Sequence, residues 1–231
     1  MEFIIAAIAG YLFGCINPAT IIAKIKKVDI RNIGSKNPGA SNVFITVGIG
    51  YGVLVGILDI LKSFLAAQIV FVLTGGNFGA SVFAGAMAVF GHNYPFWLKF
   101  NGGKGFAPFM GLILFYDWKL FLVFAVVVVA IILIIDYISV ATFSLTAFMP
   151  LYVFFTSELK IAALAFLLVA VTIWLRHRQN MKNLINGTEI GFRGKNKFEK
   201  KSRKNDSFFI CKFLRCNGAC IFLFHALFRS K

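Results

Sequence analysis

Acidic residues and histidines are scarce in this chain. Its 231 residues include 9 Asp and Glu and 3 His, against 24 Lys and Arg. A metal-dependent phosphotransferase built on several clustered aspartates would therefore lack its ligands. The sequence also contains no G-x-S-x-G and no H-E-x-x-H motif. The chain therefore does not have the signature of the α/β-hydrolases or of the zinc peptidases.

Charged residues of both signs together make up only 14% of the chain, whereas 59% of it is hydrophobic. A soluble domain has about 25% charged and about 45–50% apolar residues, so the composition predicts a multi-pass membrane protein. The formal net charge of +15 fits basic loops on the inner side of a membrane, and no nucleic-acid partner is expected. Met1-Glu2 leads straight into an apolar run without a signal-peptide pattern, so we expect the first helix to be retained.

The four cysteines give no disulfide framework. Cys15 lies in the first apolar run, and the other three, Cys211, Cys216 and Cys220, lie in the tail. This distribution fits a reducing cytoplasmic side. The tail cysteines contain no C-x-x-C pair, and we expect no metal site.

The apolar segments predict an all-α polytopic membrane protein, a seven-helix bundle with short and broken helices. They occupy residues 3–25, 43–74, 78–90, 105–136, 137–157 and 159–175. Asn17-Pro18 should break the first segment, because proline removes an amide donor and crowds the preceding turn. Tyr116 to Lys119 should form an interfacial turn that divides 105–136 into two helices. The first of these would have only about 12 residues, roughly 18 Å, too short to cross alone.

Charge sets the expected orientation. With seven spans, loops 31–42, 91–105 and 176–189 share one side with most of the basic residues, whereas six spans would separate the last loop from the other two. The positive-inside rule therefore predicts seven spans, with the N-terminus outside and the three loops cytoplasmic. We expect residues 1–192 to form the membrane domain and residues 193–231 to be a basic linker and an atypical C-terminal extension.

Two of these loops are candidate phosphate sites. Residues 91–107 include Gly102, Gly103, Lys104 and Gly105, where glycines can expose backbone amides beside a lysine. Residues 34–42 are rich in hydroxyls and amides that can donate to phosphate oxygens. The alternative for residues 91–107 is a tight interfacial turn. The alternative for residues 34–42 is a polar connecting loop.

A charged pair interrupts the second apolar segment. Asp59 and Lys62 are three residues apart, a spacing that lets them pair on one helix. Charges within a span usually face the bundle interior. A structural ion pair and a direct catalytic role are both open.

Three motifs in order give the chain a family resemblance. They are residues 34–42, the segment from Gly91-His92 to Gly105, and Arg176-His177-Arg178-Gln179-Asn180 ending in Gly187-Thr188-Glu189. Together with Asp59-x-x-Lys62, they make residues 1 to about 190 resemble the acyl-phosphate:glycerol-3-phosphate acyltransferases of the bacterial plasma membrane. An H-x-x-x-x-D pair, seen in soluble and peripheral glycerolipid acyltransferases, is absent: Trp97 and Lys182 occupy the aspartate positions after His92 and His177.

The resemblance implies a multi-pass inner-membrane enzyme with its active site facing the cytoplasm and no cofactor. Its substrates would be acyl phosphate and glycerol 3-phosphate, and its products lysophosphatidic acid and phosphate. The implied catalytic residues are Ser35, Lys104, His177 and Asn180. The implied substrate-binding residues are Lys36, Asn37, Gly39, Ser41, Asn42, His92, Gly102, Gly103 and Gly105. Glu189 would be structural.

The chain departs from the family pattern at several positions. Ile45 stands where the family usually has arginine, and Lys36 stands where it usually has glycine. Loss of an arginine from a phosphate site could cost about 1.5–3 kcal/mol, and Lys36 is the candidate to replace its charge. The alternative function for such basic loops in a membrane is a transporter or channel for phosphorylated solutes.

Overall fold

The computed structural model describes residues 1–189 and 191, and all regular elements among them are helices. The elements are α1 (Glu2–Cys15), α2 (Pro18–Ile25), α3 (Ala40–Thr46), α4 (Ile49–Leu73), α5 (Phe78–Asn93), the 3₁₀ turn η1 (Phe96–Leu98), α6 (Phe106–Tyr116), α7 (Trp118–Ile135), α8 (Ile138–Thr156), α9 (Lys160–Arg176) and α10 (Arg178–Ile185). The chain divides into two units, Met1–Arg178 and Gln179–Lys231. The predicted linker and extension, 193–231, lie outside the described residues.

The break expected in the first apolar segment is confirmed. Pro18 occupies the first turn of α2, where a missing amide donor costs nothing, and the Asn17 side chain caps that helix by accepting from the Thr20 amide at 2.8 Å. A second break, between α3 and α4, was not predicted. It lies at Gly48, whose φ of 137° is accessible mainly to glycine.

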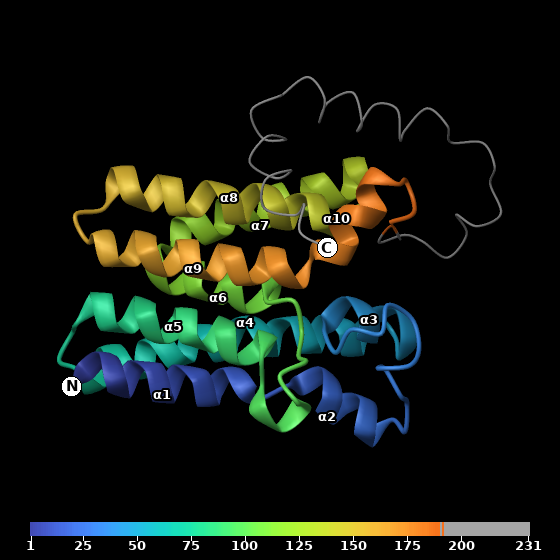
Figure 1. Ribbon diagram of the computed structural model, residues 1–231, viewed down its shortest axis with the longest axis horizontal. Coiled ribbons are helices and arrows are strands. Elements are labelled where there is room, and N and C mark those ends of the chain that lie inside the picture. Colours follow the sequence, from blue (N-terminus) through green and yellow to red (C-terminus); the bar gives the residue numbers. More distant parts are fainter. Residues whose placement is uncertain (190, 192–231) are drawn as a thin grey trace, which may run out of the picture. The chain divides into compact units, whose positions relative to one another are not determined.

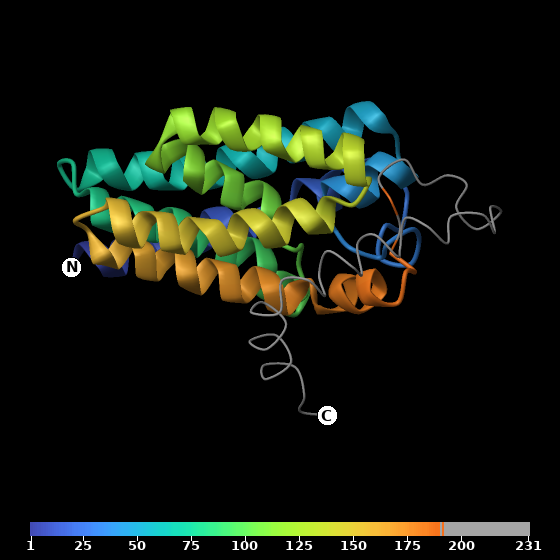
Figure 2. The same ribbon diagram turned by 90° about the horizontal axis from the view of Figure 1, so that it is seen from above.

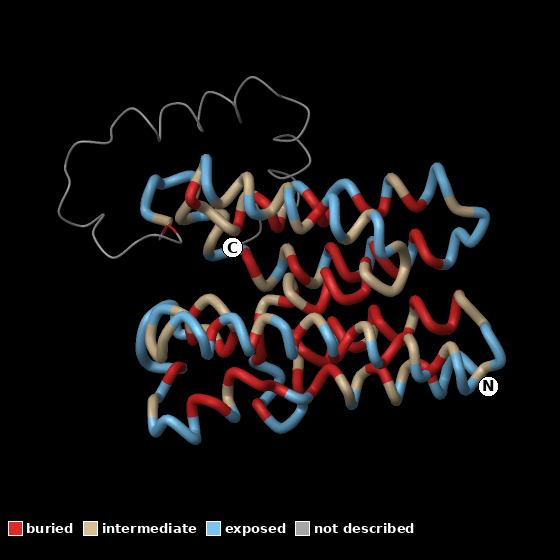
Figure 3. Tube along the Cα trace, turned by 180° about the vertical axis from the view of Figure 1, so that it is seen from behind, coloured by how far each residue is buried: buried red, intermediate tan, exposed pale blue. Residues whose placement is uncertain are grey.

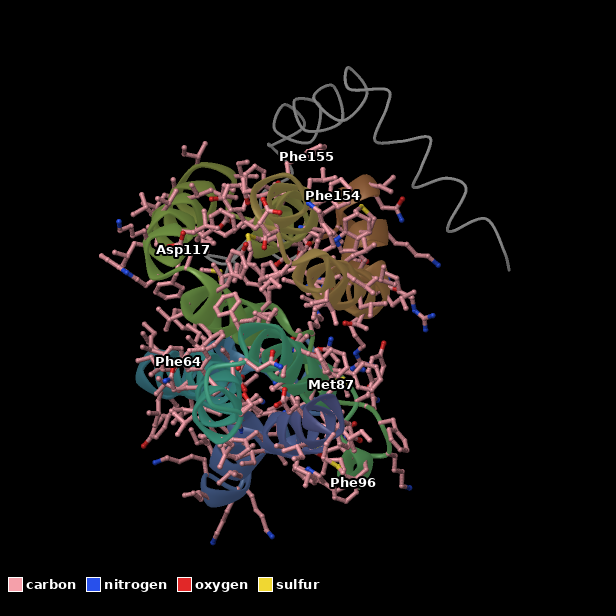
Figure 4. All side chains as sticks on the ribbon, turned by 90° about the vertical axis from the view of Figure 1, so that its left-hand side faces the viewer. Phe64, Met87, Phe96, Asp117, Phe154 and Phe155 are labelled. Carbon is pink, nitrogen blue, oxygen red and sulfur yellow. The ribbon has the colours of Figure 1, made fainter. Side chains whose placement is uncertain are left out.

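The predicted turn between two helices at 116–119 is also confirmed. Helix α6 has 11 residues, and Asp117 caps α7 by accepting from the Lys119 and Leu120 amides. Figure 4 labels Asp117, where α6 passes into α7, and Figure 2 shows α7 returning alongside α6. The polar signal at this point therefore marked a helix boundary correctly.

Helix packing in the N-terminal unit centres on α5. Helix α1 lies against it so closely that a Cβ at Gly10 or Gly14 would collide with the backbone of Ala84 or Ala88, the contact expected of a G-x-x-x-G face. Helix α5 also contacts α4, α6 and α9, while α8 packs on α7 and α9 (Figure 1). Buried residues lie on the helix faces turned toward neighbours, and exposed apolar residues lie outside (Figure 3).

Several helices have the length and hydropathy of membrane spans. These are α1 with α2 taken through their break, α4, α7 and α8, and α9 adds a fifth when joined with α10. Helices α5 and α6 have 16 and 11 residues. The all-helical fold is thus confirmed, while seven spans and the outside position of the N-terminus stay predictions.

Candidate active site

The predicted phosphate loops lie toward the end of the N-terminal unit opposite the N-terminus, where α9 also ends (Figure 1). A pocket of about 410 Å³ opens between them. Its lining comes from all three motif regions: Arg31, Ser35, Lys36, Asn37, Pro38, Asn101, Lys104 and Arg176. Four of these side chains are basic, and among the described residues that line the pocket none is acidic.

The first loop, residues 30–39, is folded around the Asn42 side chain. Asn42 is fully buried; its Nδ2 donates to the carbonyls of Ile30 and Ile33, at 2.7 and 3.2 Å, and its Oδ1 accepts from the Ser35 amide at 2.9 Å. Asn42 therefore shapes the loop from beneath and does not line the pocket. Lys36, at a positive φ of 56°, is exposed and lines the pocket.

The second loop, residues 94–105, is held by the end of α5. The amides of Gly102 and Gly103 donate to the carbonyls of Asn93 and His92 at 3.1 and 3.0 Å. A Cβ at Gly103 would collide with the His92 ring, so glycine is required by close packing here. We expected both amides to face an oxyanion; the structure instead uses them to close the loop, leaving Lys104 at the pocket.

Arginines from two distant segments clamp the outer side of the second loop. The Arg176 guanidinium donates to the carbonyls of Gly103 and Gly102, at 3.1 and 2.6 Å, and to Asn101 Oδ1 at 2.9 Å. It also lies over the Tyr94 ring, 5.6 Å from the centroid. Arg31 Nη2 donates to the Asn101 carbonyl at 2.7 Å, which joins the first loop to the second.

His177 follows α9 and is buried beside Lys104. Burial, together with the nearby lysine, lowers the pKa of this imidazole from 6.5 to about 3, so the ring is neutral at physiological pH. Its Nδ1 lies 2.9 Å from the Ile173 carbonyl, which can only accept, so Nδ1 carries the proton. Nε2 is left with a lone pair and can accept a hydrogen bond from a hydroxyl.

The depressed pKa predicts a stability loss in acid. Because the folded pKa of about 3 lies below the ordinary 6.5, the unfolded chain binds the proton first, and the neutral ring's contribution to stability is lost as the pH falls from 6.5 toward 3. The melting temperature of wild-type protein should therefore fall more over this window than that of His177→Gln. Parallel melting curves for the two proteins would contradict the assignment.

The structure separates the predicted site residues into three groups. Those that line the pocket are Ser35, Lys36, Asn37 and Lys104. Those that build the loops beneath or beside it, or lie near it, are Gly39, Ser41, Asn42, His92, Gly102, Gly103, Gly105 and His177. Asn180 belongs to the C-terminal unit, in which its Nδ2 donates to Glu189 Oε1 at 2.7 Å, and its catalytic role stays a prediction. The structural role expected of Glu189 likewise stays a prediction.

Sequence reasoning did not place Arg31, Asn101 and Arg176 in the site, although all three line the pocket. From the sequence, Arg176 and Asn101 are members of two motifs without an assigned role, and Arg31 is one of the basic residues of the first loop. The position of the two arginines at the ends of glycine- and amide-rich loops was the available signal, since arginine binds carbonyl and phosphate oxygens through several donors at once.

Comparison with known proteins shows which family the chain belongs to. The sequence model of the glycerol-3-phosphate acyltransferase family matches residues 4–187. Curated relatives named glycerol-3-phosphate acyltransferase include those of Thermosipho melanesiensis, 40% identical over 82% of this chain and 92% of the relative, and Mesorhizobium japonicum, 36% identical over 83% and 97%.

Two solved structures are also similar. Both are of PlsY (YgiH), described as an integral membrane glycerol 3-phosphate acyltransferase. The glycerol 3-phosphate form has a TM-score of 0.77 and 34% identity, over 83% of this chain and 96% of that one. The lysophosphatidic acid form has a TM-score of 0.75 and 33% identity, over 84% and 98%. From the matched sequence and the shared fold, this chain is an integral membrane protein that belongs to the glycerol-3-phosphate acyltransferase family.

Proposed function

We propose that this enzyme transfers a fatty acyl group from acyl phosphate to the 1-hydroxyl of glycerol 3-phosphate, which is the first step of bacterial phospholipid synthesis. The observation that carries the proposal is the convergence of Arg31, Lys36, Lys104 and Arg176 on one pocket. Each substrate brings a phosphate, and a pocket with four cations suits two such groups. Ile45 lies exposed on α3, so Lys36 and Arg31 are the cations available from the first loop.

The reaction needs positioning and charge stabilisation more than a strong base. The substrate hydroxyl oxygen attacks the acyl carbonyl carbon, the bond from that carbon to the phosphate oxygen breaks, and phosphate leaves. His177 is a weak base because of its low pKa, so we assign the hydroxyl proton to the departing phosphate. Nε2 of His177 then serves to orient the hydroxyl by accepting its hydrogen bond.

The proposal includes the orientation of the protein. Seven spans with the N-terminus outside would place the pocket on the cytoplasmic side of the bacterial inner membrane, where soluble glycerol 3-phosphate is available. Lys119 and Lys160 would then lie on the outer side of the membrane. The more numerous basic residues of the motif loops would lie on the cytoplasmic side.

Purified protein incubated with palmitoyl phosphate and glycerol 3-phosphate should release 1-acyl lysophosphatidic acid and inorganic phosphate in equal amounts. Palmitoyl coenzyme A, tested in parallel, should give no product. Product from coenzyme A alone would overturn the donor assignment, while uptake of glycerol 3-phosphate into vesicles without any acyl product would favour the transporter alternative. Mass spectrometry of the lipid fraction separates these outcomes.

A further inference from the structure

A buried polar cluster lies beneath the second loop, outside the pocket lining. It consists of Asp59 and Lys62 from α4 and His92 from α5, whose exposed fractions are 1%, 6% and 3%. Lys62 Nζ lies 2.8 Å from each of three acceptors: Asp59 Oδ1, His92 Nδ1 and the Ile16 carbonyl. One ammonium thus joins α4, α5 and the break between α1 and α2.

The contacts of this cluster fix the orientation of the His92 ring, whose Nδ1 also lies 3.2 Å from Asp59 Oδ1. The Lys62 ammonium has three N–H donors and three polar neighbours. Nδ1 of His92 is thus held between Lys62 and Asp59, and Nε2 lies on the opposite side of the ring. That side of the ring packs against Gly103, where a methyl group would not fit. A change in the ring's orientation would therefore displace the loop directly before Lys104.

The same ammonium also reaches the first loop. Ile16, whose carbonyl it holds, precedes Asn17, and Asn17 Nδ2 donates to the Pro38 carbonyl at 3.1 Å. Pro38 is part of the pocket lining. The neighbouring Cys15 carbonyl accepts from Trp97 Nε1 of η1 at 2.7 Å, so the end of α1 is tied to both loops.

We propose that Lys62 is a positioning residue that holds the two substrate loops at a fixed separation. It acts on Lys104 through His92 and Gly103, and on Lys36 and Asn37 through Ile16, Asn17 and Pro38. This role rests on the proposed function of the pocket and gives the buried charge pair a purpose beyond stability. A charge pair needed only for stability could be replaced by apolar groups of similar size without loss of stability or activity.

The test is the double variant Asp59→Asn/Lys62→Met. It removes both charges together, so no buried charge is left unpaired and folding should be retained. We expect the KM values for glycerol 3-phosphate and acyl phosphate both to rise and kcat/KM to fall about tenfold or more, with a melting temperature near that of wild type.

Ser63→Ala is the matched control, because Ser63 is buried next to Lys62 and its Oγ links α4 to the Gly85 carbonyl of α5 at 3.0 Å, away from the loops. It should lower the melting temperature and leave both KM values unchanged.

Hydrogen–deuterium exchange provides a measurement that does not depend on activity. In the double variant, peptides covering residues 31–42 and 99–105 should both exchange faster, whereas in Ser63→Ala they should match wild type. Unchanged exchange and unchanged KM values in the double variant would overturn the positioning role. Failure of wild-type protein to form lysophosphatidic acid, with faster exchange still seen in the variant, would overturn the proposed function alone.

Discussion

Replacement of Lys104 by alanine should lower kcat/KM for acyl transfer by about 100- to 1,000-fold, the effect of removing a main charge-stabilising group from an active site. Lys104 lines the pocket and precedes Gly105, the N-cap of α6, whose φ is 86°. An anion there would meet the ammonium and the positive end of the helix dipole together. The measurement is steady-state kinetics on Lys104→Ala and wild-type protein at matched membrane insertion.

Lys104→Arg should restore little of this activity. The backbone on both sides of Lys104 has no room to shift and re-aim a longer side chain, since Gly103 packs on His92 and a Cβ at Gly105 would meet the Asn93 side chain. A planar guanidinium needs more room and a different approach to the phosphate than an ammonium. If Lys104 were only a positive-inside anchor, arginine would substitute freely.

Lys99→Asn is the matched control for both variants. Lys99 is an exposed lysine of the same loop that does not line the pocket, and asparagine tolerates its positive φ of 54°. This variant should keep near-normal kcat/KM. Near-normal activity in Lys104→Ala as well would remove the catalytic role proposed for Lys104.

Helix boundaries were predictable where the sequence carries a local signal. Proline at position 18 and the capping Asp117 each gave such a signal, and both boundaries are present. The break at Gly48 lies within the apolar run Val47-Gly48-Ile49, where no polar residue marks a helix end. Helix α10 lies within residues 176–189, which the charge pattern alone predicts as a loop. Its apolar residues Met181, Leu184 and Ile185 have helical spacing, a signal that the emphasis on charge overlooks.

Convergence of the motif loops was predictable from charge, but their internal hydrogen bonding was not. The positive-inside rule placed the loops on one side, and the pocket lined by all three agrees with that grouping. The partners of Gly102, Gly103 and Asn42 are set by tertiary folding. Arg176, for example, binds carbonyls more than 70 positions earlier in the chain. Sequence spacing contains no information on such pairs.

That long-range clamp makes Arg176 the second position where a large loss is expected. Three of its five N–H donors are committed to the Asn101–Gly103 segment. Arg176→Lys keeps the charge but cannot span the two carbonyls and the amide oxygen with one ammonium, so the loop should shift. A displacement of about 1 Å at a reacting group can cost roughly 100-fold in rate, and we expect a loss of that order in kcat/KM.

Arg178→Lys is the control, since Arg178 is an exposed arginine two positions further along and does not line the pocket. It should retain normal kinetics. If Arg176 acts as a loop clamp, Arg176→Lys lowers kcat/KM by displacing the loop that carries Lys104. Adding Arg176→Lys to Lys104→Ala should therefore lower kcat/KM little further. Fully additive losses in the double variant would show that the two residues act independently, and that the guanidinium does not work by holding the lysine in place.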